Sequence, residues 1–247
     1  MKISVIISSY NQSIRLKHCL ESAVRMKTKF ADDIEIIVAD DNSTDGSVEL
    51  IKKFPVKLWS STRSNDKKYT LAANWNDAIF NMATGDRVLF TNGDHILTTW
   101  FADSHADPIF NKNIIFGPAY QTTPDIVPLL TEDNIGYKEI VLQCEDKNYF
   151  LPDRHVEGSA MTYNKKWSTD FPYGYNFSVC KDHFESVGGF TEFEHWGGEE
   201  QDLCDRIIDN FPGTCVLSNC NSVAIHMFHA PVNLLNRKSG DLVDYKF

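Results

Sequence analysis

Three carboxylates stand within four residues at the start of a predicted helix, in the stretch VGGFTEFEHWGGEEQDLCDR from Val187 to Arg206. Glu199, Glu200 and Asp202 repel one another, which favours a raised pKa on one of them and hence the chemistry of a general base. Glycines before them let a ligand approach the backbone, and the helix dipole stabilises carboxylates in a first turn. A glycine turn followed by an acidic helix start is the simpler explanation of this stretch taken alone.

Polar loops upstream argue for more than that simpler explanation. The segments SSYN, DDNSTDG and NGDH each follow a short apolar run of strand length. In open α/β sheets, ligands bind beyond the carboxyl ends of the strands, so these three loops are expected at one binding edge. Each loop in isolation is also compatible with an Asx or Ser turn that caps the next helix.

The elements that must position these loops alternate between strand and helix. Short apolar runs predict strands at Ile3 to Ser8, Ile34 to Ala39, Val56 to Trp59 and Arg87 to Thr91. Helices are predicted where apolar residues recur at helical spacing: Ile14, Leu16, Leu20, Ala23 and Val24; then Val48, Leu50 and Ile51; then Leu71 to Met82. This order predicts an α/β fold whose mostly parallel central sheet is flanked by helices.

Composition and charge exclude several classes of protein. The 247 residues, 42% of them hydrophobic, are typical of a globular protein, and the net charge of -10 disfavours nucleic acid polymers as partners. Six cysteines show no CxxC pair, so neither a zinc knuckle nor a disulfide framework is predicted. No apolar run is long enough for a transmembrane segment. We expect a cytoplasmic protein, a protein peripheral at the inner face of a membrane, or a catalytic domain separated from an anchor.

The three loops and the acidic stretch together resemble one family, the nucleotide-sugar-dependent glycosyltransferases of the GT-A fold, in its large inverting family-two group. VIISSYN is similar to that family's VIIPTYN, IIVADDNSTDG to VVDDGSTDG, and GDRVLFTNGDH to the strand that delivers the metal-binding DxD. GGFTEFEHWGGEEQDLCDR resembles the GGFDE…WGGEDxDLxxR signature of galactosyl- and N-acetylgalactosaminyltransferases. The resemblance covers about residues 1 to 95 and 157 to 229. It implies one GT-A domain over 1–247, with a nucleotide-binding half at 1–95 and an acceptor-binding and catalytic half at 96–247.

For the donor, the resemblance implies a UDP-sugar. Tyr10 would stack on the uracil, Asp41 would accept from its imide N–H, and Ser8 would lie at the strand tip beside them.

A divalent cation, Mn²⁺ or Mg²⁺, would bind the donor diphosphate, because such ions prefer oxygen ligands and tolerate an imidazole. The implied ligands are Asp94, with Asn92 in place of the usual first Asp of DxD, and His226 on a late strand from Val223 to Phe228. His95 is a further ligand or a loop histidine, and His229 matches the family position less well than His226. Where the family often has an Arg near the donor, this chain has Trp75, with Arg63, Lys67 or Lys68 as possible substitutes.

For catalysis, the resemblance makes Glu200 the general base that takes the proton from the acceptor hydroxyl. Glu199 would bind a sugar hydroxyl, and Asp202 would hold the acceptor or cap the helix. Trp196 offers a flat face to a sugar ring or belongs to the core, and Asn176 is a weaker candidate beneath the donor sugar.

The middle, from Ile96 to Val156, predicts a strand at Ile114 to Tyr120 and then long loops that would bind the acceptor. The predicted activity is inverting transfer of a sugar, galactose or N-acetylgalactosamine, to a carbohydrate or glycolipid acceptor. A catalytically degenerate nucleotide-sugar-binding module is the alternative. Nucleotidyl transfer is disfavoured, because SSYNQS is not a glycine- and lysine-rich phosphate loop.

Overall fold

The structure is a computed structural model of the chain. It describes residues 1–62, 70–117, 119–122, 151–152, 175–195, 197–219, 221–227 and 229.

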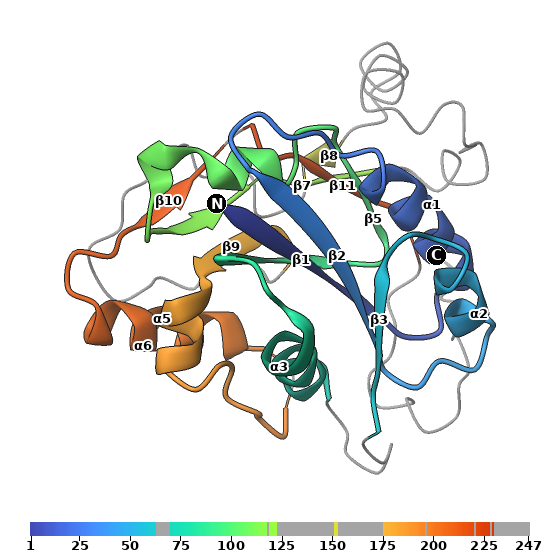
Figure 1. The fold of residues 1–247 in the computed structure, drawn as a ribbon. Coiled ribbons are helices and arrows are strands. Elements are labelled where there is room, and N and C mark those ends of the chain that lie inside the picture. Colours follow the sequence, from blue (N-terminus) through green and yellow to red (C-terminus); the bar gives the residue numbers. More distant parts are fainter. Residues whose placement is uncertain are drawn as a thin grey trace.

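A seven-stranded sheet with the order β10-β6-β9-β4-β1-β2-β3 forms the centre of the fold (Figure 1). Its strands are β1 (Lys2–Ser9), β2 (Asp33–Asp40), β3 (Lys57–Ser60), β4 (Arg87–Asn92), β6 (Ile114–Phe116), β9 (Phe177–Cys180) and β10 (Val216–Ser218). Strands β3, β2, β1 and β4 are parallel neighbours, whereas β9 is antiparallel to both β4 and β6. The mostly parallel sheet with flanking helices confirms the predicted α/β class.

Side chains alternate between the two faces of this sheet, and each face has its own hydrophobic core. On β1, Ile3, Val5 and Ile7 pack on one face and Ile6 on the other. The first face is covered by α1 (Ser13–Ala23), α2 (Ser47–Ile51) and the 3₁₀ turn η1 (Asp103–Ala106). A second 3₁₀ turn, η2, spans Pro108–Phe110. Strands buried on both faces read as continuous apolar runs, which is why their sequence signal was strong.

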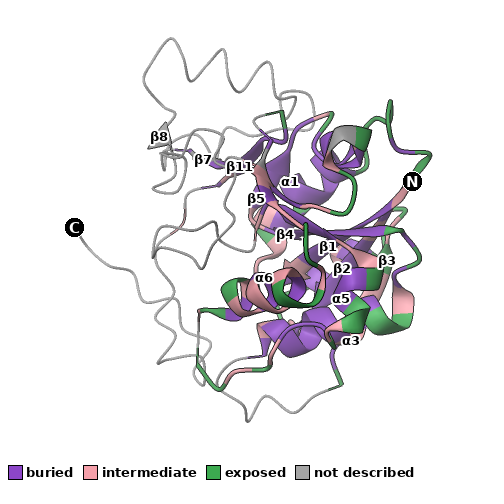
Figure 2. Ribbon diagram, turned by 90° about the vertical axis from the view of Figure 1, so that its left-hand side faces the viewer, coloured by how far each residue is buried: buried purple, intermediate pink, exposed green. Residues whose placement is uncertain are grey.

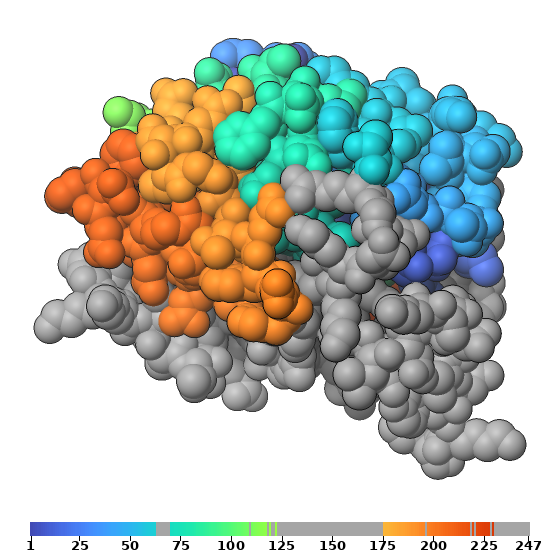
Figure 3. Space-filling model, turned by 90° about the horizontal axis from the view of Figure 1, so that it is seen from below, coloured from blue at the N-terminus to red at the C-terminus, as the bar shows by residue number. Residues whose placement is uncertain are grey.

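The second face is covered by α3 (Leu71–Met82), α5 (Lys181–Ser186) and α6 (Glu199–Asn210). Seen from below, the segments that carry α5 and α6 lie beside α3 on one surface of the molecule (Figure 3). Figure 2 shows that the purple, buried parts of these helices face the sheet.

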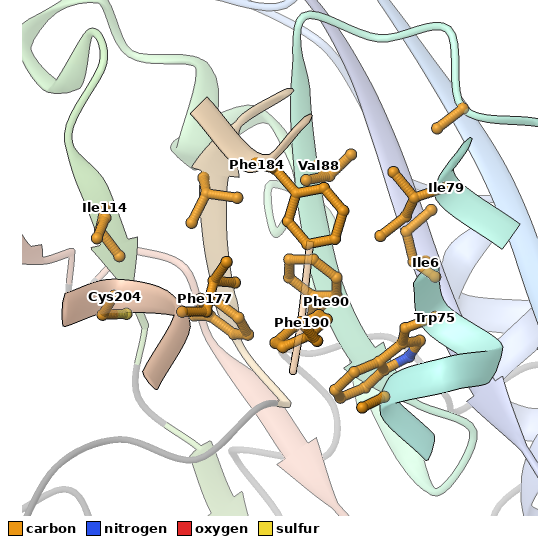
Figure 4. Close-up of a cluster of buried hydrophobic side chains, with 14 of the residues drawn as sticks. Ile6, Trp75, Ile79, Val88, Phe90, Ile114, Phe177, Phe184, Phe190 and Cys204 are labelled. Carbon is orange, nitrogen blue, oxygen red and sulfur yellow. The ribbon is translucent and has the colours of Figure 1, made fainter. Parts of the chain in front are cut away.

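Aromatic rings fill the core beneath α3, α5 and α6 (Figure 4). Phe90 of β4 stacks on Phe177 of β9 with ring centroids 4.6 Å apart, and Phe190 meets the edge of Phe90 at 5.1 Å. Trp75 packs against both Phe90 and Phe190. These contacts join the N-terminal strands to the segment before α6, so the acidic helix start is fixed relative to the sheet.

A second, four-stranded sheet has the order β5-β11-β7-β8. Its strands are β5 (His95–Leu97), β7 (Ala119–Gln121), β8 (Leu151–Pro152) and β11 (Ala224–His226). The small sheet is attached to α1, because the backbone N–H of Leu97 donates to Ser22 Oγ at 3.0 Å. Strands β5 and β11 are antiparallel, with His95 paired to His226.

Two local predictions are corrected. The strand expected from Ile114 to Tyr120 is two strands in different sheets, β6 and β7, because the chain passes from one sheet to the other at Gly117. There a Cβ would lie 2.1 Å from the backbone oxygen of Ser222. Ile14, assigned to the apolar face of the first helix, is 74% exposed at the helix start. In the part of the chain that the structure describes, no helix has the length and apolar character needed to cross a bilayer.

Candidate active site

The loops after β1 and β2 are bonded to each other at the carboxyl edge of the sheet. Asn11, with a φ of 46°, donates its backbone N–H to Ser43 Oγ, and its side-chain oxygen accepts from the N–H of Thr44 at 2.7 Å. Asp45 accepts from the N–H of Ser13 at 2.8 Å. These hydrogen bonds therefore connect the segments that follow β1 and β2.

Ser8, Tyr10 and Asp41, the predicted nucleotide-binding residues, all lie at this edge. Asp41 is buried, its N–H donates to Ser9, and its carboxylate accepts from Thr70 Oγ1 at the start of α3. Tyr10 is half-buried. Their contacts with uracil remain a prediction.

Asp94, in the turn after β4, lies against His226 and His229 at the end of β11. The Asp94 Oδ2 atom lies 3.2 Å from His229 Nε2 and 3.5 Å from His226 Nε2, and the two Nε2 atoms are 3.2 Å apart. Asp94 lies between β4 and β5, His226 is the last residue of β11 and His229 follows it, and all three side chains remain partly exposed. His226 and His229, which the sequence offered as alternatives for one ligand, thus both lie in the same cluster.

His95 lies behind this cluster and orients it. Its Nδ1 contacts Asp94 Oδ1 at 2.7 Å, and its buried ring stacks on His226 with centroids 4.9 Å apart and on Tyr175 at 5.0 Å. The alternative of a loop histidine facing solvent is thereby wrong. Although burial opposes ionisation, the histidines hold the pKa of Asp94 well below its usual value, so the carboxylate is charged.

The three ligand atoms fit a divalent cation. All lie within 4.8 Å of one another, and one carboxylate with two imidazoles is a donor set that Mn²⁺ and related ions accept. Neighbouring ligands at about 2.1 Å from an octahedral ion are about 3 Å apart, close to the spacing seen here. His95 supplies a contact from outside the ligand set, of the kind that typically orients a ligating side chain.

Asn92, which stands in place of the first Asp of DxD in the sequence comparison above, is the last residue of β4. Its side-chain oxygen accepts from Ser8 Oγ at 2.7 Å, across the paired strands β1 and β4. The amide therefore links the predicted nucleotide and metal residues, and its role as a ligand remains a prediction.

The acidic helix begins as predicted, with Gly197 and Gly198 at φ values of 92° and 98° and Glu199 as the first residue of α6. Glu199 is buried and Glu200 is partly exposed. The Asp202 carboxylate accepts from Thr191 Oγ1 at 2.6 Å and pairs with Arg206. Asp202 thus fixes the turn before the helix.

Two side chains clamp the GGF turn that precedes this helix. Arg206 donates to the carbonyl oxygens of Val187 and Gly189, at 2.7 and 2.8 Å. Asn76 of α3 bonds both the N–H and the carbonyl oxygen of Phe190. Neither clamp was predicted from the sequence, since an Asn in a helix has no distinctive signal.

Asn176, the weaker candidate beneath the donor sugar, is held in the protein interior, and its contact with the sugar remains a prediction. Its side chain is only 1% exposed and bonds His105 Nε2, Ser222 Oγ and the Ser222 carbonyl oxygen. Burial, assisted by the charge of Arg87, lowers the pKa of His105 to about 3, so this histidine is neutral. The network braces the chain just before β11 and its His226.

Trp196 and the cations Arg63, Lys67 and Lys68 lie outside the described residues.

Comparison with known proteins gives two family matches. The glycosyl transferase family 2 profile matches residues 4–187, about three quarters of the chain, and one described as the N-terminal domain of galactosyltransferase matches residues 154–229.

Among curated proteins, the chain is similar to a poly(ribitol-phosphate) beta-glucosyltransferase of Bacillus spizizenii. The two are 24% identical over 242 residues, which cover 84% of this chain and 37% of that protein. A validoxylamine A glucosyltransferase of Streptomyces hygroscopicus is 26% identical over 220 residues, with 83% of this chain and 51% of that protein covered. The chain thus spans between about a third and a half of the length of these relatives.

Among solved structures, residues 1–349 of S. aureus TarS in complex with UDP-GlcNAc superpose with a TM-score of 0.67 at 15% identity, covering 98% of this chain and 62% of that one. The feature that this structure shares with the chain is the GT-A fold.

Proposed function

The chain belongs to glycosyl transferase family 2, and we propose that it transfers galactose or N-acetylgalactosamine from a UDP-sugar to a carbohydrate or glycolipid acceptor with inversion. That it is a glycosyltransferase follows from the family match and the similarity to characterised transferases. The galactosyl preference is supported by the second profile match, which covers the GGF turn and the acidic helix.

The convergence of Asp94, His226 and His229 is the observation that carries the proposal. Asp94 follows β4 by two residues, and the bond between Ser8 and Asn92 joins the end of β4 to the tip of β1, where the nucleotide residues lie. When bound there, Mn²⁺ or Mg²⁺ would neutralise the charge that develops on the departing diphosphate. Such a cation would let an acidic protein bind a donor that carries two phosphates.

The protein's own residues would perform the remaining steps. Asp41 and Tyr10 bind the uracil, and the bonded β1 and β2 loops hold both in place. Glu200 accepts the proton of the acceptor hydroxyl as the hydroxyl oxygen attacks the anomeric carbon from the face opposite the nucleotide. Asp202, Arg206 and Asn76 act as positioning residues, because they fix the turn from which the Glu200 helix starts.

A donor panel tests the proposal. Release of the nucleotide from UDP-Gal, UDP-GalNAc, UDP-Glc, UDP-GlcNAc and GDP-Man is measured with Mn²⁺ and with a chelator. We expect Mn²⁺-dependent release of UDP from a galactosyl donor above the others. Release without metal, or from GDP-Man alone, contradicts the proposed donor and cofactor.

Glu200→Gln tests the base separately. Transfer should fall by at least about 100-fold while UDP affinity is kept, since general acid–base catalysis contributes about 10²–10⁴-fold. Asp209→Asn, on the exposed face of the same helix, is the matched control. Full transfer by Glu200→Gln would remove it from this role.

A degenerate nucleotide-sugar-binding module is the second candidate. It is favoured by Asn92, whose side-chain oxygen is bonded to Ser8 and carries no charge. Such a module would bind UDP-sugars yet release no UDP in the donor panel.

A further inference from the structure

A patch of apolar and basic side chains lies at the connection between α1 and β2. We call it the basic-aromatic patch and define it by Val24, Arg25, Lys27, Lys29, Phe30 and Trp100. All six residues are exposed. The large hydrophobic side chains exposed among the described residues number five, and three of them, Val24, Phe30 and Trp100, belong to this patch.

Hydrogen bonds hold the two segments of the patch in place. The N–H of Lys27 donates to the carbonyl oxygen of Thr99 at 2.8 Å, which places Trp100 beside the α1–β2 connection. A single oxygen of buried Asp103 accepts the N–H groups of Lys29, Phe30 and Ala31, at 2.7 to 2.8 Å. The exposed apolar side chains therefore stand on a fixed backbone.

The local charge of the patch is positive, although the whole chain carries -10. The carboxylates next to it are already engaged. Asp32 pairs with the N-terminal amine and Asp33 with Lys2 at 3.3 Å, whereas Asp103 accepts three N–H groups and offsets one of the three cations of the patch. Since charges are screened beyond about 8–10 Å at physiological salt, the local cations decide what the patch attracts.

We propose that the basic-aromatic patch docks this protein on an anionic lipid surface. Trp and Phe partition into the interface between headgroups and acyl chains, while Lys and Arg beside them are attracted to anionic headgroups. Because the rest of the molecule is acidic and repelled by the same surface, docking would fix a single orientation.

That orientation places the catalytic edge away from the lipid. The N–H of Asp32 bonds the carbonyl oxygen of Met1, so the patch lies at the amino end of β1, whereas the nucleotide loops follow its carboxyl end (Figure 1). Eight strand residues span about 26 Å. An acceptor anchored in the same membrane would be reached at the tip of an extended glycan, a consequence that rests on the proposed function.

The test is cosedimentation of the full chain with vesicles at 0.15 M salt, with phosphatidylglycerol-containing vesicles compared with pure phosphatidylcholine. We expect binding to the anionic vesicles only. K27E/K29E should weaken it at least about tenfold, since each cation near such a surface contributes about 1 kcal/mol. W100S should weaken it at both low and high salt. The matched control is K52E/K53E, which makes the same charge change at two exposed lysines after α2.

Absence of binding to anionic vesicles overturns the proposal, as does an equal loss in K52E/K53E. Sedimentation velocity gives the competing outcome: a dimer that W100S converts to a monomer would assign the patch to contact between copies of the chain. Metal-dependent UDP release in the absence of lipid should be unchanged in all three variants. Loss of UDP release in the wild type would contradict the proposed function but not the docking proposal. If UDP release persists, the vesicle-binding result tests docking alone.

Discussion

Glu35→Gln should destabilise the fold without altering the catalytic edge. Glu35 lies on β2 at the amino end of the sheet, where its carboxylate accepts from Ser4 on β1 and from the N–H of Thr84 before β4, and pairs with Lys57 on β3 at 2.7 Å. Burial opposes ionisation of this carboxyl, but its bonds to Lys57, Ser4 and Thr84 prevail and lower its pKa from 4.5 to about 2.

The size of the effect follows from that difference. A carboxyl with a pKa of about 2 in the folded state and 4.5 in the unfolded state contributes at most about 3.4 kcal/mol to the free energy of unfolding. Because Lys57 is 44% exposed and water screens the pair, we expect about 1–2 kcal/mol, or a fall in Tm of about 3–6 °C. The contribution is complete above pH 4.5 and is lost as the pH falls toward 2.

Reversible urea unfolding of wild type and Glu35→Gln at pH 7, 5 and 3 measures this. The two proteins should differ at pH 7 and 5 and approach each other at pH 3. Glu185→Gln breaks a partly exposed pair with Lys181 and is the control, with an expected loss under about 0.5 kcal/mol. Equal stability of wild type and Glu35→Gln at pH 7 would refute the reasoning.

Two further predictions concern the metal cluster and the chain that carries it. His229→Gln and His226→Gln should each lower Mn²⁺ affinity, by at least about 100-fold, because outer-shell changes alone cost 10–100-fold. Titration calorimetry measures this, and an unchanged affinity in His229→Gln would leave Asp94 and His226 as the ligands. Gly117→Ala should cost about 3 kcal/mol of stability, because its Cβ would lie 2.1 Å from the Ser222 carbonyl oxygen. Urea unfolding indistinguishable from wild type would show that this approach relaxes freely.

Much of the fold could be predicted because the strands are buried on both faces. β1, β2 and β4 read as apolar runs, and the loops after them carry polar residues that a connection does not require. Ile14 and the run from Ile114 to Tyr120 show where this reasoning fails. An apolar residue at a helix start can face solvent, and one apolar run can divide between two sheets when a glycine allows a close backbone contact.

The site was partly predictable for a related reason. Asp94 and His226 stand at strand ends, where sequence position indicates location. Asn176 was expected beneath the donor sugar because its segment resembles a known one, yet its orientation depends on His105 and Ser222, which are 71 and 46 residues away. Such long-range hydrogen bonds leave no pattern in the local sequence.

Asp94 directly precedes β5, whereas His226 ends β11 and His229 follows it, so cation binding should stiffen this end of the β5–β11 pair. The N–H of Met227, directly after β11, donates to the carbonyl oxygen of Asp94 at 2.8 Å, and His226 and His229 flank it along the chain. A cation held by these three side chains would oppose opening of that bond, because the free energy of cation binding is lost when the two strands separate. Hydrogen exchange should therefore slow at Met227 when Mg²⁺ is added and return to its original rate with a chelator. Amides in β2, which lies on the far side of β1 from Asp94, should exchange equally with and without the ion. Protection that rises equally at Met227 and in β2 would indicate general stabilisation. Unchanged exchange at Met227 at saturating Mg²⁺ would place the cation elsewhere.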